Sequence, residues 1–205
     1  KAQIFSFVSD KTWLVQKVIA STYASGGNLL VPWDVWQGGG KPRYFGKEED
    51  YANYYGFVRA MSDYLEGYED AFYHNSQTDP RYLDFEKMPL YFSEYRRNFH
   101  AYVRAIPNDK DAPVVIHLVD WEIPNVDSTE IVLNVDHFFK EGVAKPELLQ
   151  PIKYNKNMIE ENLDSTNCNV FYTMTNLNSK YEGKKMRIKI PKLEFHWGIL
   201  VLPKD

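Results

Sequence analysis

The pattern of hydrophobic and polar positions begins with a strand, a helix and a second strand. Residues 2–8 form an apolar run typical of a short buried strand, and apolar residues between Leu14 and Thr22 then recur at helical spacing. Residues 28–35 form a second apolar run, in which Pro32 marks the end of the strand because proline has no N–H for a ladder. Such a strand–helix–strand unit favours parallel pairing with a right-handed crossover.

The two helices predicted in this part of the chain carry signals at their ends. Ser9 or Asp10 offers an N-cap for the first helix, and Gly26-Gly27 follow its last turn. The second helix follows a glycine-rich loop and starts with the acidic residues 48–50, where the helix dipole favours negative charge. Its apolar stripe at residues 51–65 keeps the spacing i, i+3, i+4, i+7 and is the strongest helical signal in the chain.

The pattern changes near residue 98 to short apolar runs separated by turns. Before this change, residues 72–88 are polar and irregular, and residues 90–97 form a possible short helix. Several strands at short spacing predict an antiparallel β-sandwich. The predicted strands cover residues 100–106, 113–120, 129–136, 169–175, 184–190 and 195–202.

The predicted fold class is therefore α/β plus all-β, with an α/β part at residues 1–97 and a β-sandwich at residues 98–205. Two parallel strands with two or three helices cannot cover both faces of a sheet. We therefore expect the first part to be the C-terminal segment of a (β/α)₈ barrel, a fold that needs about 250 residues. The missing N-terminal barrel segment would lie outside these 205 residues.

Composition and charge exclude several classes of partner. The net charge of −4 argues against nucleic acid, which requires a basic face. No apolar run approaches the roughly 20 residues that span a bilayer. The five histidines and the single cysteine show no metal-ligand spacing, so we expect neither a metal nor a cofactor. The aromatic content of 16% first reflects core packing, but aromatic rings also line sugar-binding clefts.

Several segments in combination resemble glycoside hydrolases of the agarase and porphyranase type. Residues 26–36 (GGNLLVPWDVW), residues 42–46 (PRYFG) and the tyrosine-rich helix after them resemble the last barrel strand and following helix of these enzymes. Residues 114–121 and 197–201 resemble the β-sandwich appended behind such barrels. The resemblance implies a retaining hydrolase of a galactan polysaccharide such as agarose or porphyran. It also implies a secreted, periplasmic or cell-surface location.

In these hydrolases two catalytic glutamates lie at the ends of the fourth and seventh barrel strands. If residues 28–35 are the eighth strand, residues 2–8 are the seventh, yet residues 2–10 contain no glutamate. No catalytic carboxylate can therefore be assigned within this chain. We expect the catalytic glutamates upstream of it.

The residues around the end of the second predicted strand are the candidate substrate-binding residues: Trp33, Asp34, Trp36, Arg43 and Tyr44. The C-terminal end of a barrel strand is the face where barrel active sites form. Either tryptophan can stack on a sugar or pack the barrel, and Asp34 can bind a sugar hydroxyl or cap a turn. Arg43 can engage an anionic group such as a sugar sulfate, or brace its loop against the acidic helix start.

A rival hypothesis is a non-catalytic carbohydrate-binding or scaffold module, in which the sandwich binds glycan through surface aromatic residues. Placement distinguishes the two hypotheses. The enzyme hypothesis requires Trp33 and Asp34 to open into a cleft completed by other chain segments. The module hypothesis predicts exposed aromatic side chains on the sandwich instead.

Overall fold

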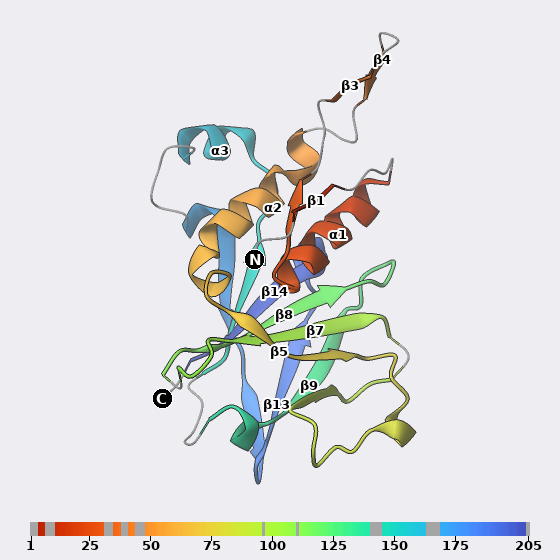
Figure 1. The fold of residues 1–205 in the computed structure, drawn as a ribbon, viewed down its shortest axis with the longest axis vertical. Coiled ribbons are helices and arrows are strands. Elements are labelled where there is room, and N and C mark those ends of the chain that lie inside the picture. The colour runs from red at the N-terminus through yellow and green to blue at the C-terminus, as the bar shows by residue number, and fades with distance from the viewer. Residues whose placement is uncertain are drawn as a thin grey trace.

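The structure is a computed structural model that describes most of the chain as two antiparallel sheets and a helical layer (Figure 1). The described residues are 4–6, 11–30, 35–37, 41–43, 48–95, 97–109, 111–139, 145–162 and 169–203. One sheet contains β5 (Glu69–Asn75), β7 (Phe99–Ala105), β8 (Val114–Asp120), β10 (Glu147–Pro151), β11 (Tyr172–Asn176) and β14 (Trp197–Leu202). The other contains β6 (Leu90–Phe92), β9 (Ser128–Asn134), β12 (Ser179–Glu182) and β13 (Lys185–Pro191).

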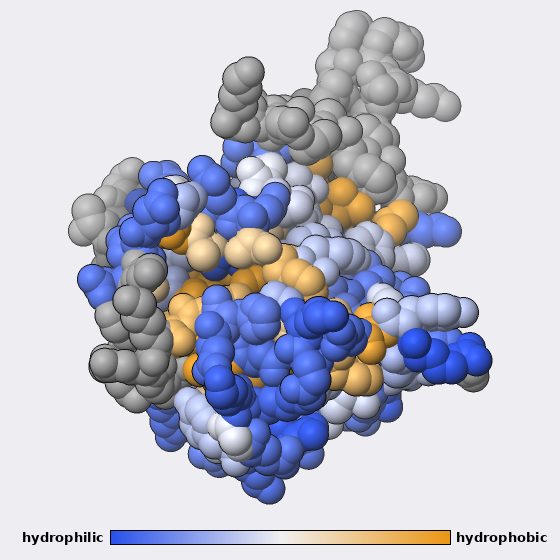
Figure 2. Space-filling view, turned by 60° about the horizontal axis from the view of Figure 1, so that its bottom comes forward, coloured by the Kyte–Doolittle hydropathy of each residue, from blue (hydrophilic) through white to orange (hydrophobic). Residues whose placement is uncertain are grey.

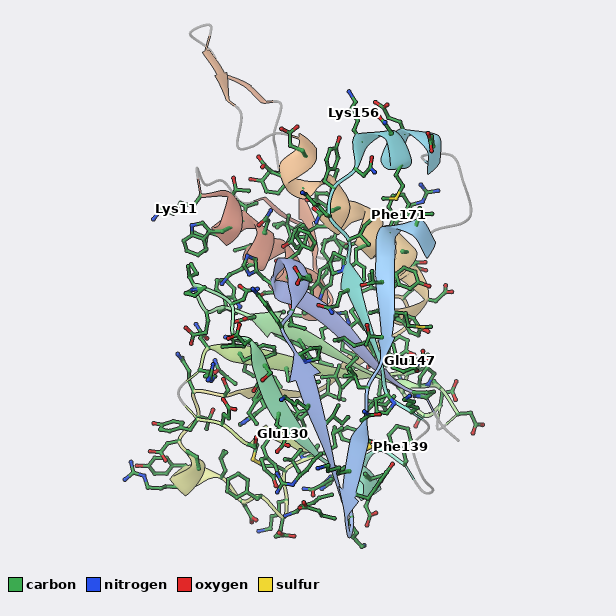
Figure 3. All side chains as sticks on the ribbon, turned by 180° about the vertical axis from the view of Figure 1, so that it is seen from behind. Lys11, Glu130, Phe139, Glu147, Lys156 and Phe171 are labelled. Atoms are coloured by element: carbon green, nitrogen blue, oxygen red, sulfur yellow. The ribbon has the colours of Figure 1, made fainter. Side chains whose placement is uncertain are left out.

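The two sheets pack face to face as a sandwich. The six-stranded sheet has the order β11-β10-β14-β8-β7-β5 and the four-stranded sheet the order β12-β13-β9-β6. Ile116 and Leu200 of the first sheet share one buried core with Ile131 and Ile188 of the second. Figure 3 shows the sandwich from behind, with Glu147 in β10 and Glu130 in β9. The predicted antiparallel arrangement of the strands is confirmed.

A helical layer covers the outer face of the six-stranded sheet. It consists of α1 (Thr12–Ala24) and α2 (Glu48–Ala60), joined to the parallel strands β1 (Ile4–Ser6) and β2 (Asn28–Leu30). α1 packs chiefly on β8 and α2 on β10, so Val119 and Ile199 of the sheet share a second core with the helices. The predicted parallel strand–helix–strand unit is confirmed, whereas a barrel segment is not shown by the described residues.

The remaining elements are short. A hairpin consists of β3 (Val35–Gln37) and β4 (Lys41–Arg43), and α3 covers Lys156–Asn162. No helix in the described ranges has the length and apolar character to cross a bilayer. Short 3₁₀ turns lie at Ser62–Tyr64, Pro80–Tyr82, Val135–His137, Asn169–Phe171 and Glu194–His196.

The C-terminal end of α1 shows why the predicted stop at Gly26-Gly27 is correct. Gly26 has a φ of +76°, and the backbone N–H of Gly27 donates to the carbonyl oxygen of Thr22 at 2.9 Å. A Cβ at Gly26 would also lie 2.6 Å from Nη1 of Arg104. Glycine thus ends the helix and admits a buried β7 arginine, which pairs with Asp70 at 2.7 Å.

Several sequence predictions about individual elements were wrong. Residues 90–97 contain the buried strand β6 rather than the predicted helix. The strand was missed because three residues are too few to show the alternation of a strand. The stretch predicted as irregular from residue 72 begins inside β5, an edge strand in which Glu69, Asp70 and Tyr73 are exposed and His74 is buried. β10 and β12 were not predicted. The domain boundary near residues 97–100 stays a prediction, although β5 and β6 of the sandwich precede it.

Candidate functional site

The predicted substrate-binding residues follow the end of β2, and the structure describes only part of them. Trp33, Asp34 and Tyr44 lie outside the described residues. Trp36 belongs to β3 and Arg43 to β4, where the backbone pairs Trp36 with Pro42 and Val35 with Arg43. Two of the five predicted residues therefore belong to neighbouring strands of one hairpin. Figure 1 shows this hairpin at the end of the molecule opposite β13 and β9.

Side chains of both helices hold β2 in place near this end of the molecule. The hydroxyl of Tyr55 in α2 donates to the carbonyl oxygen of Leu29 at 3.0 Å. Gln16 Nε2 in α1 donates to the carbonyl oxygen of Asp50 at 2.8 Å, which joins α1 to the start of α2. Burial raises the pKa of Tyr23, and its hydrogen bond with the Leu29 backbone partly offsets that rise. The strand that leads to Trp33 is thus held by two contacts at Leu29, one from each helix, and the two helices are joined to each other by Gln16.

A buried polar cluster, missed by sequence reasoning, joins α1 to the loop after β8. Lys17 is fully buried, and its Nζ donates to the carbonyl oxygen of Glu122 at 2.7 Å. The pKa of Lys17 is lowered by burial, against the opposing effect of Asp120 and Glu122. Asp120 accepts backbone N–H groups from Glu122 at 2.9 Å and from Val126 at 2.8 Å. These bonds fix the loop against the helix and explain why a lysine stands on the apolar side of α1.

Replacing Asp120 by alanine should destabilise the protein by about 2–4 kcal/mol, because two buried backbone N–H groups lose their acceptor and Lys17 loses a nearby negative charge. Urea unfolding measures this loss. Asp127→Ala removes an exposed carboxylate of the same loop and is the matched control, for which we expect little change. Equal losses in the two variants would contradict the anchoring role of Asp120.

The turn before β14 is also tied to this loop. Phe195 and His196 both have positive φ, 53° and 64°, a conformation that costs about 1–3 kcal/mol per non-glycine residue and needs support from its surroundings. The hydroxyl of Tyr54 donates to the carbonyl oxygen of Phe195, and the ring of His196 bonds Oδ1 of Asn125 through Nδ1. Burial, and then the nearby Lys17, lower the pKa of His196 to about 4. The ring is therefore neutral at pH 7 and carries its proton on Nδ1, because Oδ1 can only accept.

The opposite end of the sandwich contains a pocket to which sequence reasoning assigned no role. Its volume is about 530 Å³, and Phe72, Ile106 and Phe138 contribute to its apolar wall, with Asp136 at its rim. Phe139, which also lines it, lies far from Lys156 and the hairpin in Figure 3. Figure 2, in which the bottom of the molecule comes forward, shows hydrophobic surface exposed between hydrophilic rims. This pocket is separate from the predicted strand-end site.

Exposed aromatic residues do occur on the sandwich, as the module hypothesis predicts. Tyr73 in β5 is 49% exposed and Tyr181 in β12 is 50% exposed. On the helical layer, Trp13 is 39% exposed. Sequence reasoning assigned none of these three a role, since single aromatic residues in short runs give no signal of exposure. Their presence keeps both hypotheses open.

Comparison with known proteins gives only weak structural likeness. No family model and no curated protein sequence matches the chain. Among solved structures, α-L-fucosidase isoenzyme 2 from Paenibacillus thiaminolyticus matches 58% of this chain with a TM-score of 0.36 and 12% identity. The match spans 16% of the fucosidase chain. A weak structural neighbour of this chain is therefore a glycoside hydrolase, at a similarity too low to decide its activity, its substrate or its site.

Proposed function

We propose that this chain is the C-terminal portion of a glycoside hydrolase, in which β1 and β2 close a (β/α)₈ barrel and the sandwich packs behind it. The observation that supports this proposal is the position of the helical layer. α1 contacts β2 on one side and β8 on the other, and its residues Val15, Ile19 and Ala20 are fully buried. In a barrel with a second domain packed on it, a helix likewise lies between a barrel strand and the second domain.

The parallel pair itself also favours a larger sheet. A parallel pair such as β1 and β2 is normally part of a sheet covered on both faces, and an isolated two-stranded sheet is marginal in water. We therefore propose that strands from an N-terminal segment of the same protein continue this sheet. The C-terminal ends of β1 and β2 would then belong to the active-site face of the barrel.

The proposed substrate is a galactan polysaccharide such as agarose or porphyran, hydrolysed with retention by two glutamates outside this chain. Retaining hydrolysis needs two carboxyl groups roughly 5–5.5 Å apart, one as nucleophile and one as acid and base. In this proposal the chain supplies one wall of the cleft. Trp33 and Trp36 stack on sugar faces, Asp34 accepts a hydrogen bond from a sugar hydroxyl, and Arg43 and Tyr44 contact the substrate from the hairpin side.

The experiment measures reducing ends released from agarose, porphyran and related galactans by the complete gene product. We expect hydrolysis of at least one of them, and a roughly 10- to 100-fold lower kcat/KM for Asp34→Ala, since one substrate hydrogen bond is lost. Tyr82→Ala, an exposed ring in the loop after β5, is the control and should keep wild-type activity. Folded wild-type protein that releases no reducing ends from any galactan would overturn the proposal.

A second candidate function is a non-catalytic carbohydrate-binding module, favoured by the exposed ring of Tyr73 on the sandwich. The same assay separates the two candidates. A module retains galactan without hydrolysing it, and its binding is insensitive to Asp34→Ala. The enzyme loses activity with that substitution.

A further inference from the structure

The six-stranded sheet is wider than the helical layer that covers it. Since α1 packs chiefly on β8 and α2 on β10, the outer face of the edge strand β5 extends beyond the helices, whereas that of its neighbour β7 is partly covered where Arg104 packs against Ala24 and Gly26. The register places Tyr73 of β5 opposite Tyr102 of β7, and Asn75 opposite His100. These four side chains share the outer face, because the alternate residues of β7 point into the core between the sheets.

The rings on this part of the sheet form one continuous aromatic surface. The centroids of Tyr73 and Tyr102 are 5.0 Å apart, and those of Tyr73 and His100 are 5.9 Å apart. His100 stacks on Tyr102 with an interplanar angle of 18° and lies 6.0 Å from Trp121, which follows β8. Each spacing is within the range of ordinary aromatic contacts.

Hydrogen bonds hold these rings in fixed orientations. His100 Nε2 lies 2.7 Å from Oδ1 of Asn98, an atom that can only accept, so this nitrogen carries the proton. The other nitrogen, Nδ1, then accepts from the Tyr73 hydroxyl at 2.8 Å. Burial lowers the pKa of His100 to about 4, which keeps this neutral arrangement at pH 7.

The aromatic surface continues onto α1. Trp121 Nε1 donates to Oγ of Ser21 at 3.1 Å. Ser21, Lys17 and Trp13 follow one face of the helix at intervals of four residues, roughly 12 Å in all. Nζ of Lys17 lies 5.8 Å from the ring of Trp13 and bonds the carbonyl of Glu122, next to Trp121. Trp13 therefore extends the surface along the helix.

We propose that these five side chains, Tyr73, Tyr102, His100, Trp121 and Trp13, here called the aromatic row, bind a polysaccharide chain at a site separate from the strand end of β2. The ligand class, a galactan, rests on the proposed function. Tyr73 and Trp13 are exposed, and the other three rings are partly buried between them. The row therefore offers apolar ring surface to successive pyranoses, with the amides of Asn75 and Asn98 beside it for sugar hydroxyls.

The chemistry of the aromatic row favours a sugar over a nucleic acid, which also stacks on aromatic rings. Binding of single-stranded nucleic acid combines stacking with a positively charged groove along its phosphates. The row consists of rings that are neutral at pH 7, the neighbouring Lys17 is fully buried, and the chain has a net charge of −4. A ligand with an uncharged backbone of hydroxyl groups fits these properties better.

The test measures the affinity of the complete gene product for soluble agarose and porphyran by affinity electrophoresis. We expect the double variant Tyr73→Ala, Trp13→Ala to bind about 10- to 100-fold more weakly, in line with the loss of one or two stacking contacts. Tyr181→Ala is the matched control, a ring of similar exposure on the other sheet, and should bind as wild type does. Tyr73→Phe keeps the ring and should retain most of the affinity.

The outcomes separate this inference from the proposed function. Hydrolysis of a short soluble oligosaccharide should not change in the single variant Tyr73→Ala, because Tyr73 lies on the edge strand β5 of the sandwich. Trp13 is left intact in this measurement, since it lies at the start of α1, which follows the C-terminal end of β1. If the double variant binds polysaccharide as tightly as Tyr181→Ala does, the aromatic row is not a binding site, even where the wild type hydrolyses galactan. If the double variant binds more weakly and the wild type releases no reducing ends, the aromatic row is supported and the proposed hydrolase activity is overturned. Folded wild-type protein that binds no galactan overturns the row as stated.

Discussion

Replacing Trp197 by alanine is expected to lower the free energy of unfolding by about 3–5 kcal/mol, the range for deletion of a large buried aromatic side chain. Trp197 is the first residue of β14 and is completely buried. Its ring meets Phe57 edge-on at 4.9 Å and stacks with Tyr23 and Tyr54 at 6.4 Å. The truncation removes contacts with both helices at once. The expected loss is large, because the free energy of unfolding of a typical domain is only about 5–15 kcal/mol.

Urea unfolding followed by circular dichroism measures this effect, with Tyr181→Ala as the control for loss of an exposed ring. Trp197→Phe should cost much less, because the indole N–H has no hydrogen-bond partner among the described residues and an aromatic ring is kept. A loss below about 1 kcal/mol for Trp197→Ala would show that this ring does not join the helices to the sheet.

Because Trp197 belongs to a core shared by the helices and the sandwich, we also expect one cooperative transition for the two parts. The second core contains Ile19 of α1, Phe57 of α2 and Val119 of β8. A helical layer that unfolded separately would leave these sheet residues exposed to water. This shared core joins α1 and α2 to the six-stranded sheet.

The parts of the fold that were predicted correctly are those with long, regular periods. The stripe at residues 51–65 predicted α2, although this helix ends at Ala60 and the stripe continues through the 3₁₀ turn Ser62–Tyr64. α1 lies between two apolar runs that pair as parallel strands. β5 was missed because it is an edge strand with a register shift between Asp70 and Phe72, so its alternation is interrupted. β10 ends at Pro151 and is recognisable only through its pairing with β14 and β11.

The candidate functional residues also divide into those with a local sequence signal and those that only the fold brings together. Trp33 and Asp34 were singled out by their position after a strand, a local signal, and their role remains a prediction. The aromatic row joins Trp13, Tyr73, His100 and Trp121, which are up to 108 residues apart in the sequence. Only the register of β5 on β7 and the packing of α1 on β8 bring these rings together. No local pattern could have predicted that surface.

Acid should destabilise this protein between about pH 6.5 and pH 4 because buried histidines resist protonation. Burial lowers the pKa of His74 to about 4, and burial with a smaller effect of Arg104 lowers the pKa of His117 to about 3. The unfolded chain has histidine pKa values near 6.5, so in this window it binds protons that the folded state does not bind. Stability therefore rises with pH through the window, by up to about 1.4 kcal/mol per pH unit for each histidine.

His117→Leu isolates the larger of these two contributions. His117 is completely buried beside Trp197, with centroids 6.1 Å apart, and neither ring nitrogen has a hydrogen-bond partner among the described residues. The leucine variant should be more stable than wild type at pH 5, because it removes both the proton-linked loss and two unsatisfied polar atoms. Urea midpoints at pH 7.5, 6 and 5 measure the difference in slope, and His137→Gln, an exposed histidine, serves as the control. A His117→Leu slope equal to that of wild type would mean that His117 is not the buried neutral group that this geometry requires.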